Sequence, residues 1–315
     1  MAGAFTIEPY RSQWHEDWDD FVRWSKNGTF LLCRDFMEYH SDRFNDASLI
    51  ILGKNKRIKA LLPGNISGST FYSHQGLTYG GIIMSDDMTA EETLEIFELI
   101  KDYLSNLGIV DIIYKPIPHI YHRQPAEEDL YALFRNDAQL ISRQISTAIF
   151  LPDPLPLTLK RRQKLNKACH LELECKETAD VAEFMAMVED NLQKRHSVHS
   201  VHSPEEMQRL RYKFPDNIKL LIALDHDRLV AGALSFVTDT VVHTQYLCAN
   251  DEGRKLSALD FVIDKMKTQY KSDHRWLDLG TSNLDGGRYL NEGLIAQKEG
   301  FGGRAIVYDS YRLSI

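Results

Sequence analysis

The chain has 315 residues, of which 43% are hydrophobic and 26% are charged, and its formal net charge is −8 at pH 7. This length suits two domains better than one, and the hydrophobic content lets each domain bury a core. The negative balance argues against a general nucleic-acid or membrane-surface binder, although a local basic patch is compatible with it.

The absence of an expected membrane span or signal sequence and the spacing of the cysteines predict a cytoplasmic protein. No apolar run approaches the roughly twenty residues of a membrane span, and the N-terminal stretch has no basic-then-apolar signal sequence. No two cysteines have Cys-x-x-Cys spacing, so we expect reduced thiols in a cytoplasmic protein. The cysteines are Cys33, Cys169, Cys175 and Cys248.

The first half of the chain predicts alternating strands and helices. Trp14–Trp24 has apolar residues at helical spacing, and Thr89–Leu107 has acids in its first turn and Gly108 as its stop. The expected strands are Phe5–Pro9, Ser48–Leu52, Lys59–Pro63, Thr70–His74, Gly76–Met84, Val110–Lys115 and Leu140–Leu151. The expected helices are Trp14–Trp24, Thr29–Phe44, Thr89–Leu107 and Ala126–Phe134.

The second half begins with a basic segment, Leu155–His170, and then repeats the pattern. Three β-rich runs separated by polar turns predict a meander, and a polar loop containing Gly253 leads into an amphipathic helix around Leu256–Met266. The expected strands are Leu171–Cys175, Ile218–Leu224, Leu229–Val237, Val241–Ala249, Trp276–Gly280 and Arg304–Leu313. The other expected helices are Asp180–Arg195, Pro204–Phe214 and Tyr289–Glu299.

Both halves have one order of elements: strand, two helices, three-strand meander, long helix, strand, short helix, strand. This shared order predicts an α/β (α+β) protein made by architectural duplication, with domains at residues 1–151 and 152–315. Prolines at positions 152, 154 and 156 make the expected boundary a stiff linker.

This order, found twice, resembles the Gcn5-related N-acetyltransferase (GNAT) fold, and the tandem halves resemble its FemAB-like branch, whose best-known members add amino acids to cell-wall precursors. The resemblance implies two GNAT-like domains, each a mixed, mostly antiparallel sheet flanked by helices. It also implies acyl transfer, N-acetyl or aminoacyl, to an amine of a sugar or peptide-like acceptor in cell-surface polysaccharide or envelope metabolism. The stretches that carry it are SHQGLTYGGIIM, IIYKPIPHIYH, LVAGALSF, HTQYLCANDEGRKLSALDFVID, WLDLGTSN and LNEGLIAQKEGFGGRAIVYDSYRL.

The resemblance implies acetyl-CoA or another acyl-CoA as the donor. CoA-dependent members have a Q/R-x-x-G-x-G/A loop whose backbone N–H groups close on the pyrophosphate. The corresponding stretch, 250–258, keeps one glycine; its acids would repel phosphate and its two cations would attract it. Ala296 stands where the family usually has a tyrosine. The expected cofactor-binding residues are Leu247, Ala249, Gly253, Arg254, Lys255 and Ser257.

Three residues are candidates for catalysis. In the resembling fold the fourth strand splays from the fifth, and its free N–H groups polarise the acyl carbonyl. Alternation places His243 on one face of this strand and Tyr246 on the other, and either could act as a base or bind substrate. Asp278 ends the fifth strand and could bind or deprotonate an amine. Each could instead be a sheet or turn position satisfied by its neighbours.

Candidate substrate-binding residues come from both halves. In the second half they lie in a polar loop near the fifth strand and at the edge of the HSVHSVHS segment, which lacks the carboxylate or cysteine partners of a metal site. In the first half, aromatic and cationic side chains at strand ends suit an anionic or saccharide ligand. These residues are His74, Tyr79, Lys115, Tyr121, His122, Arg195, Ser282, Asn283, Tyr289 and Asn291.

Two rival functions stay open. One is a FemAB-like transferase that uses aminoacyl-tRNA, although the long helical hairpin with which such enzymes often embrace tRNA is not visible in the sequence. The basic segment Leu155–His170 could attract phosphate from coenzyme A, a nucleotide-linked sugar or tRNA, but a solvated helix face is the favoured interpretation. The other is a catalytically silent module that binds a saccharide or nucleotide sugar. The expected partner is a small-molecule, peptide or saccharide acceptor, without nucleic acid and without a membrane span.

Overall fold

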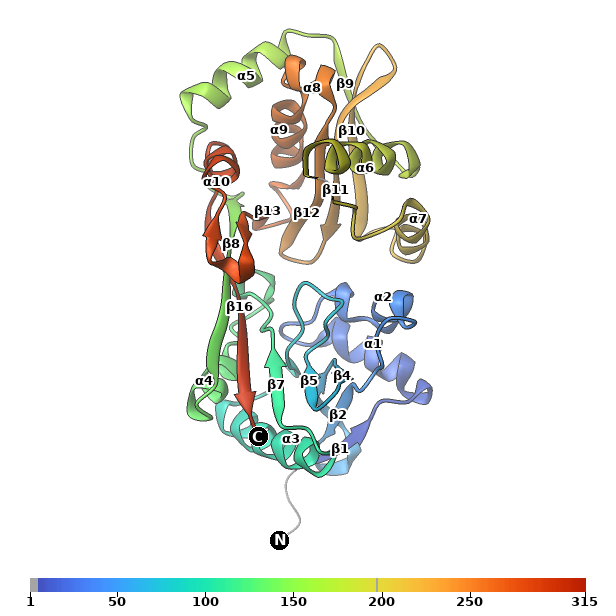
Figure 1. The fold of residues 1–315 in the computed structure, drawn as a ribbon, viewed down its shortest axis with the longest axis vertical. Helices are drawn as coiled ribbons and strands as arrows, with labels where there is room; N and C mark the ends of the chain where they lie inside the picture. The colour runs from blue at the N-terminus through green and yellow to red at the C-terminus, as the bar shows by residue number, and fades with distance from the viewer. Residues whose placement is uncertain (1–4, 197) are drawn as a thin grey trace. The chain divides into compact units, whose positions relative to one another are not determined.

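The computed structural model describes residues 5–196 and 198–315, and the chain forms two compact units. Unit 1 contains Met1–Ile145, Asn283–Tyr289 and Val307–Ile315, and unit 2 contains Ser146–Ser282 and Leu290–Ile306. The chain passes between them four times: within the long strands β8 (Gln139–Phe150) and β16 (Arg304–Ser314) (Figure 1), and after Ser282 and Tyr289. The domain boundary expected near residue 151 remains a prediction.

Unit 1 contains two groups of strands and four helices. The first group is antiparallel, in the order β1-β2-β3-β6, and the second has the order β4-β5-β7 followed by β16 and β8. The strands are β1 (Thr6–Pro9), β2 (Leu49–Leu52), β3 (Ile58–Leu62), β4 (Asn65–Ser67), β5 (Thr70–Tyr72), β6 (Ile83–Met84) and β7 (Asp111–Tyr114). The helices are α1 (His15–Trp24), α2 (Arg34–Met37), α3 (Ala90–Asn106) and α4 (Glu128–Arg135).

Two expected elements of unit 1 are wrong. The strand predicted over Gly76–Met84 is only Ile83–Met84, because Gly80 packs against the backbone of Ser73, where a Cβ would lie 1.9 Å from the carbonyl oxygen. The helix predicted over Thr29–Phe44 is reduced to α2 and two 3₁₀ turns. Within this segment the Arg34 side chain is buried and donates a hydrogen bond to the Asp46 carboxylate at 2.6 Å, which fixes the short helix α2.

Unit 2 is a mixed sheet with helices on both faces. Its strands follow the order β8-β13-β12-β11-β10-β9, with a β10-β11-β12 meander as predicted. The strands are β9 (Leu173–Thr178), β10 (Ile218–Asp225), β11 (Arg228–Val237), β12 (Val241–Ala249) and β13 (Trp276–Thr281). A two-stranded ribbon of β14 (Asn283–Leu284) and β15 (Tyr289–Leu290) follows β13 and belongs to unit 1 apart from Leu290. The helices are α5 (Leu159–Cys169), α6 (Ala182–His196), α7 (Pro204–Lys213), α8 (Asp251–Leu256), α9 (Ala258–Tyr270) and α10 (Glu292–Glu299).

The two faces of this sheet have different coverings. On one face α9 packs on a core that includes Val242, Leu277 and Leu279. On the other face α6 lies over the meander, and Phe184 packs so closely on Gly232 that a Cβ there would meet its ring at 2.8 Å. The mixed α/β fold class expected from the sequence is confirmed.

The stretch expected to be a polar loop before α9 is helical. The Asn250 side chain accepts a hydrogen bond from the backbone N–H of Gly253 at 2.8 Å, and this cap starts α8. Ser257 then adopts a left-handed conformation, with φ of 59°, and separates α8 from α9. Similarly, α10 begins at Glu292 and not at Tyr289, because Asn291 caps it. Within the described residues no helix is long and apolar enough to cross a membrane.

Candidate active site

A gap opens between β12 and β13 in unit 2. The two strands are parallel neighbours over three pairs only, of which the last joins His243 to Asp278. Beyond His243, β12 continues to pair with β11, and no further β13 partner occurs among the residues that the structure describes. Backbone N–H groups of β12 that would bond a β13 strand therefore face this gap.

A β-bulge in β12 changes which side chains face the same way. Leu234 pairs with Tyr246 and Ser235 with Thr244, so Gln245 is the extra residue. Since Leu234 and Phe236 share a face of β11, their partners Tyr246 and His243 share a face of β12. The expectation that Tyr246 points away from His243 is wrong, because simple alternation does not include a bulge.

The structure brings His243 and Asp278 together. His243 Nδ1 lies 3.0 Å from Asp278 Oδ2, and the Asp278 side chain is fully buried while that of His243 is 15% exposed. Asp278 also accepts hydrogen bonds from the Ser146 hydroxyl and from the Gly280 N–H. A carboxylate fixed by these donors can orient the imidazole and hold the Nδ1 proton, which leaves Nε2 as a hydrogen-bond acceptor at the gap.

Lys298 of α10 is a site residue that the sequence reasoning missed. Its ammonium group donates to the carbonyl oxygens of Gly280 at 2.8 Å and Thr281 at 2.7 Å, at the end of β13. The side chain is buried, and burial lowers the pKa of Lys298 to about 8, while the nearby Asp278 opposes that shift. The sequence does contain one indication of this residue: Lys298 lies three residues from Ile295 and three from Phe301, so it shares the buried side of this segment with two apolar residues.

Tyr246 makes its contacts with the segment between α6 and α7. Its hydroxyl oxygen lies 2.8 Å from His202 Nδ1 and 3.2 Å from the His202 backbone N–H, which donates to it. Burial raises the pKa of Tyr246 above its usual value, so the phenol stays protonated at neutral pH. A protonated phenol suits a binding role better than that of a base.

The expected cofactor residues form a capped helix and not an open phosphate loop. Gly253 is required by packing, since a Cβ there would lie 2.0 Å from the Val230 carbonyl oxygen. Arg254 is occupied by the Asp251 carboxylate and the Ala249 carbonyl oxygen. Among the others, Ala249 and Ser257 are buried, Leu247 is half-buried and Lys255 is exposed.

Substituting Gly253 with alanine tests whether this glycine is needed for packing against β11 or only for binding a phosphate group. Because the obstacle is the backbone of β11, we expect a loss of about 1–3 kcal/mol in the free energy of unfolding. Chemical denaturation measures it. Gly293→Ala is the matched control, since a Cβ at that helical position meets only a side-chain oxygen at 3.7 Å and should be nearly neutral. Equal stability of the two variants would contradict the packing role.

A pocket of about 320 Å³ lies beside the start of α8 in unit 2. Its lining includes Arg195, which is half-exposed and lies 3.9 Å from Asp251. Acids and cations alternate around this pocket, so it lacks the uniformly positive lining that favours a pyrophosphate. Its residues are Met187, Asp190, Asn191, Lys194, Arg195, Asn250, Asp251, Glu252 and Arg254.

The other loop residues of the second half have separate positions. Ser282 is buried in unit 2, and its hydroxyl has no hydrogen-bond partner within the described residues. Asn291 caps α10, while Asn283 accepts a bond from the Ile145 N–H in unit 1. Tyr289 is 60% exposed. Only Ser282 therefore lies next to the end of β13 with an unsatisfied polar atom.

The predicted ligand residues of the first half are buried inside unit 1. Tyr79 bonds Thr29 at 3.0 Å, and the Lys115 ammonium donates to the Leu77 carbonyl oxygen at 2.5 Å. Burial lowers the pKa of His74 to about 3.

His122 and Tyr121 are also committed to internal contacts. His122 lies 2.8 Å from the Ile117 carbonyl oxygen, and burial lowers its pKa to about 4. The hydroxyl of Tyr121 lies 2.8 Å from that of Tyr308. A buried imidazole whose pKa is lowered in this way is neutral and is a poor ligand for an anion. The anionic or saccharide site expected in this half therefore stays a prediction.

No metal site is evident in the described part of the chain, 5–196 and 198–315, where no group of three or more His, Cys, Asp or Glu side chains could hold an ion. In the HSVHSVHS segment, His199 Nδ1 lies 2.6 Å from Glu189, and His202 contacts Tyr246. Residue 197 of this segment lies outside the described residues.

Comparisons with known proteins identify the fold. Residues 158–289 match the family described as "Acetyltransferase (GNAT) domain". The structure of FemX is similar, with a TM-score of 0.69 and 10% identity over 98% of this chain and 97% of that chain.

Two other solved structures resemble the chain at a TM-score of 0.62 and 11% identity. One is the C-terminal domain of a putative lysylphosphatidylglycerol synthetase from Agrobacterium fabrum, covering 96% of this chain and 92% of that chain. The other is L-PGS from Bacillus licheniformis, covering 94% and 90% respectively. No curated protein matches the sequence at a significant level.

Residues 158–289 thus form a GNAT domain by their family match, and the chain as a whole shares the fold of FemX. Both findings agree with the resemblance to tandem, FemAB-like proteins that the sequence shows.

Proposed function

We propose that the protein transfers an aminoacyl group from an activated ester to an amine of a sugar or peptide-like acceptor. The observation that carries this proposal is the gap between β12 and β13, with the His243–Asp278 pair and Lys298 around it. The donor carbonyl would lie in the gap, where preorganised N–H groups stabilise negative charge on its oxygen.

The transfer follows from these groups. The acceptor amine attacks the carbonyl carbon, and His243 Nε2 accepts the proton that the amine loses as the C–N bond forms. The ester C–O bond then breaks, and the protonated imidazole returns the proton to the leaving alcohol. Asp278 stabilises the imidazolium in between. Lys298, bonded to the carbonyl oxygens at the end of β13, would supply a positive charge on this side of the gap.

Three observations favour an ester donor over acyl-CoA. The backbone at the start of α8 is capped by Asn250, and Arg254 is paired with Asp251. The acids Asp251 and Glu252 stand at the entrance where a pyrophosphate would approach. Finally, two similar structures carry lysylphosphatidylglycerol synthetase or L-PGS in their titles, and the first name denotes transfer of a lysyl group.

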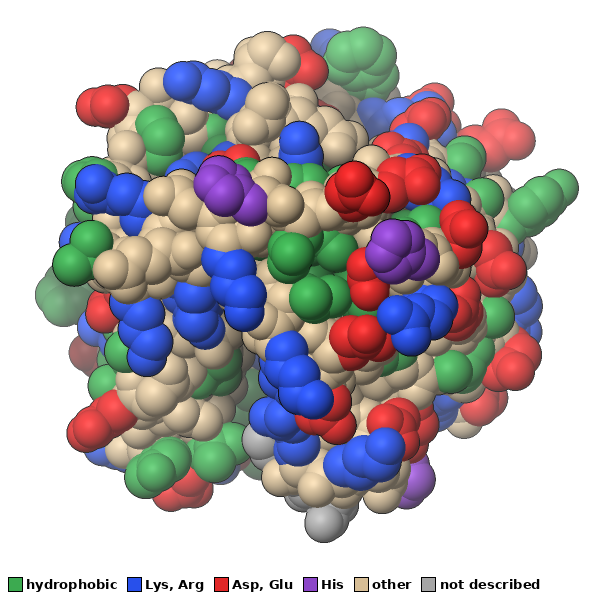
Figure 2. Space-filling model, turned by 90° about the horizontal axis from the view of Figure 1, so that it is seen from above, with side chains coloured by type: hydrophobic (Ala, Val, Ile, Leu, Met, Phe, Trp, Pro, Cys, Tyr) green, Lys and Arg blue, Asp and Glu red, His purple; other side chains and the backbone are tan. Residues whose placement is uncertain are grey.

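Helix α5 supplies a basic surface that fits a donor carried on a polyanion such as tRNA. It has five Lys or Arg residues and no acid, in a chain of net charge −8. Arg161 is committed internally to Asp260 at 3.0 Å, and the other four cations are exposed or half-exposed. They are Lys160, Arg162, Lys164 and Lys167. Figure 2 shows Lys and Arg side chains gathered on this end of unit 2.

A binding experiment tests the donor class. A tRNA acceptor-stem minihelix ending in a non-transferable 3′-aminoacyl amide should bind the protein, and acetyl-CoA should not compete. Neutralising the four α5 cations to glutamine should weaken binding more than tenfold and reduce the salt slope by about one per cation. As a control, Lys54, Lys56 and Arg57 of unit 1 are neutralised. Tight competition by acetyl-CoA, or equal effects of both variants, would overturn the ester-donor proposal.

A further inference from the structure

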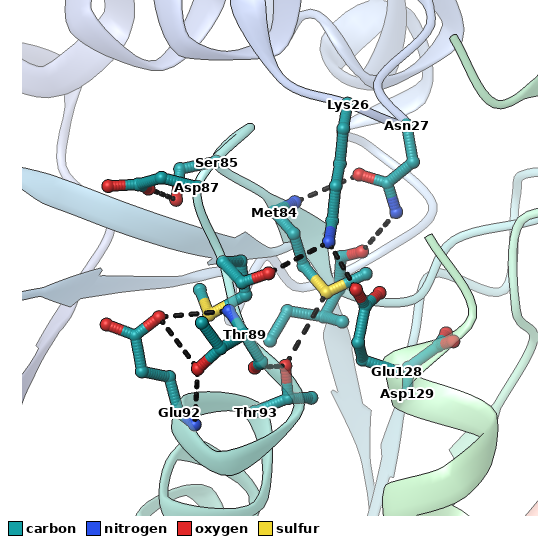
Figure 3. Close-up of polar contacts among 12 residues, drawn as sticks. Lys26, Asn27, Met84, Ser85, Asp87, Thr89, Glu92, Thr93, Glu128 and Asp129 are labelled. Carbon is teal, nitrogen blue, oxygen red and sulfur yellow. Dashed lines mark hydrogen bonds and ion pairs between the residues drawn. The ribbon is translucent and has the colours of Figure 1, made fainter. Parts of the chain in front are cut away.

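The start of α3 in unit 1 has its own capping groups. Thr89 and Glu92 form a capping box, with their reciprocal bonds at 3.2 and 3.0 Å, and the Ser85 hydroxyl donates to Asp87 at 2.6 Å (Figure 3). The helix N-terminus is thus occupied by internal acceptors. The carboxylates around it would repel a phosphate group.

A cavity of about 550 Å³ lies beside this helix start, entirely within unit 1. The apolar part of its lining includes Phe21 of α1, Ile58 of β3 and Phe5, which directly precedes β1. Trp24 also lines it and is 83% exposed, whereas Trp18 of the same helix is fully buried. A tryptophan exposed at a cavity mouth offers a flat apolar surface that no part of the described chain covers.

The polar lining of this cavity is nearly balanced in charge. Lys59 bonds Asp87 at 2.9 Å and lies 3.4 Å from Glu92, so the central charges neutralise one another. Two further cations line the Gly53–Arg57 turn, and two further acids line the approach to α3 and its first half. These residues are Lys54, Arg57, Asp86 and Glu95. The wall therefore offers both donors and acceptors without a strong field of either sign.

The backbone that carries Trp24 is held in place. Next to it, the buried Lys26 donates to Glu128 at 2.6 Å and to the Met88 carbonyl oxygen at 3.1 Å. Asn27 donates to the Ile82 carbonyl oxygen and accepts from the Met84 N–H, each at 2.9 Å (Figure 3). The segment after α1 is thereby bonded to β6 and α4, so the backbone position of Trp24 is fixed.

We propose that this cavity is a binding site for a neutral saccharide. An exposed aromatic ring on a fixed backbone can stack on the apolar C–H face of a sugar, while carboxylates, amide and cationic side chains around it bond the hydroxyl groups. The near balance of charge favours a sugar without phosphate or carboxylate. The site lies in unit 1 and is independent of the transfer chemistry proposed for unit 2.

Calorimetric titration of the full chain tests this site. The probes are N,N′,N″-triacetylchitotriose, cellotriose and glucose 6-phosphate. At least one neutral trisaccharide should bind, and the phosphorylated sugar should bind at least tenfold more weakly. Trp24→Ala should weaken binding at least tenfold, and Trp24→Phe should retain part of it. Tyr212→Ala, at a residue of unit 2 that is 85% exposed, is the control and should bind as the unaltered chain does.

The stability of the variants keeps the result interpretable. Trp24 is exposed, so Trp24→Ala should leave the thermal midpoint close to that of the unaltered chain. Absence of binding by both neutral trisaccharides would overturn the proposal. So would equal affinity of Trp24→Ala and the unaltered chain, or glucose 6-phosphate binding as tightly as the neutral probes.

Discussion

Substituting His243 with alanine should lower the rate of acyl transfer by about 10²–10⁴-fold, the usual contribution of a positioned general base. The imidazole lies at the mouth of the β12–β13 gap, and Asp278 orients it at 3.0 Å. Single-turnover kinetics with a preformed enzyme–donor complex measures the chemical step without contributions from product release.

Two further variants complete this test. His226→Ala is the matched control, because His226 lies in the exposed β10–β11 turn of the same unit, and its rate should not change. His243→Gln keeps a polar side chain of similar size without a base, so it should lose the rate while donor affinity stays within about twofold, a change of roughly 0.4 kcal/mol. Full activity of His243→Gln would remove the histidine from the chemistry.

Replacing Lys298 with methionine should lower the transfer rate by about 10²–10³-fold, as the loss of an oxyanion-stabilising group does in other enzymes. The variant keeps the length of the side chain but loses both bonds to the carbonyl groups of Gly280 and Thr281. Lys298→Arg keeps the charge and should recover part of the rate. Lys271→Met changes an exposed lysine of unit 2 and is the control.

The pH dependence of the transfer rate tests whether the positive charge of Lys298 is needed. The pKa of Lys298 is lowered from 10.5 to about 8 by burial, so the transfer rate should fall as pH rises through about 8, and this fall should be absent from Lys298→Met. Stability moves the opposite way. Between about pH 8 and pH 10.5 the unfolded chain binds more protons at Lys298 than the folded chain does. The contribution of Lys298 to the free energy of unfolding therefore rises with pH in this range. A rate that falls in step with loss of folded protein would contradict this account.

Much of the fold follows from local sequence patterns. The acids in the first turn of α3, its end at Gly108 and the meander of β10–β12 are predicted from spacing and turn residues. His243 and Asp278 are both candidates by sequence. The structure pairs them because the strand after α9 returns parallel to β12.

The remaining site features depend on contacts that a pattern does not contain. The bulge at Gln245 turns Tyr246 to the His243 face, and no residue type announces it. The polar loop expected at 250–257 is helical because Asn250 caps it and Gly253 fits against Val230. The histidines of the first half resemble ligand residues in sequence, but tertiary packing buries them.

The position of the donor carbonyl tests the central claim most directly. Crystals of the full chain with a stable 3′-aminoacyl-adenosine amide would locate it. The carbonyl oxygen should lie between β12 beyond His243 and the end of β13, within hydrogen-bonding distance of a β12 backbone N–H, with the carbonyl carbon accessible from the His243 side. An analogue bound elsewhere, with the gap closed by side chains of the protein, would contradict the proposed transfer site.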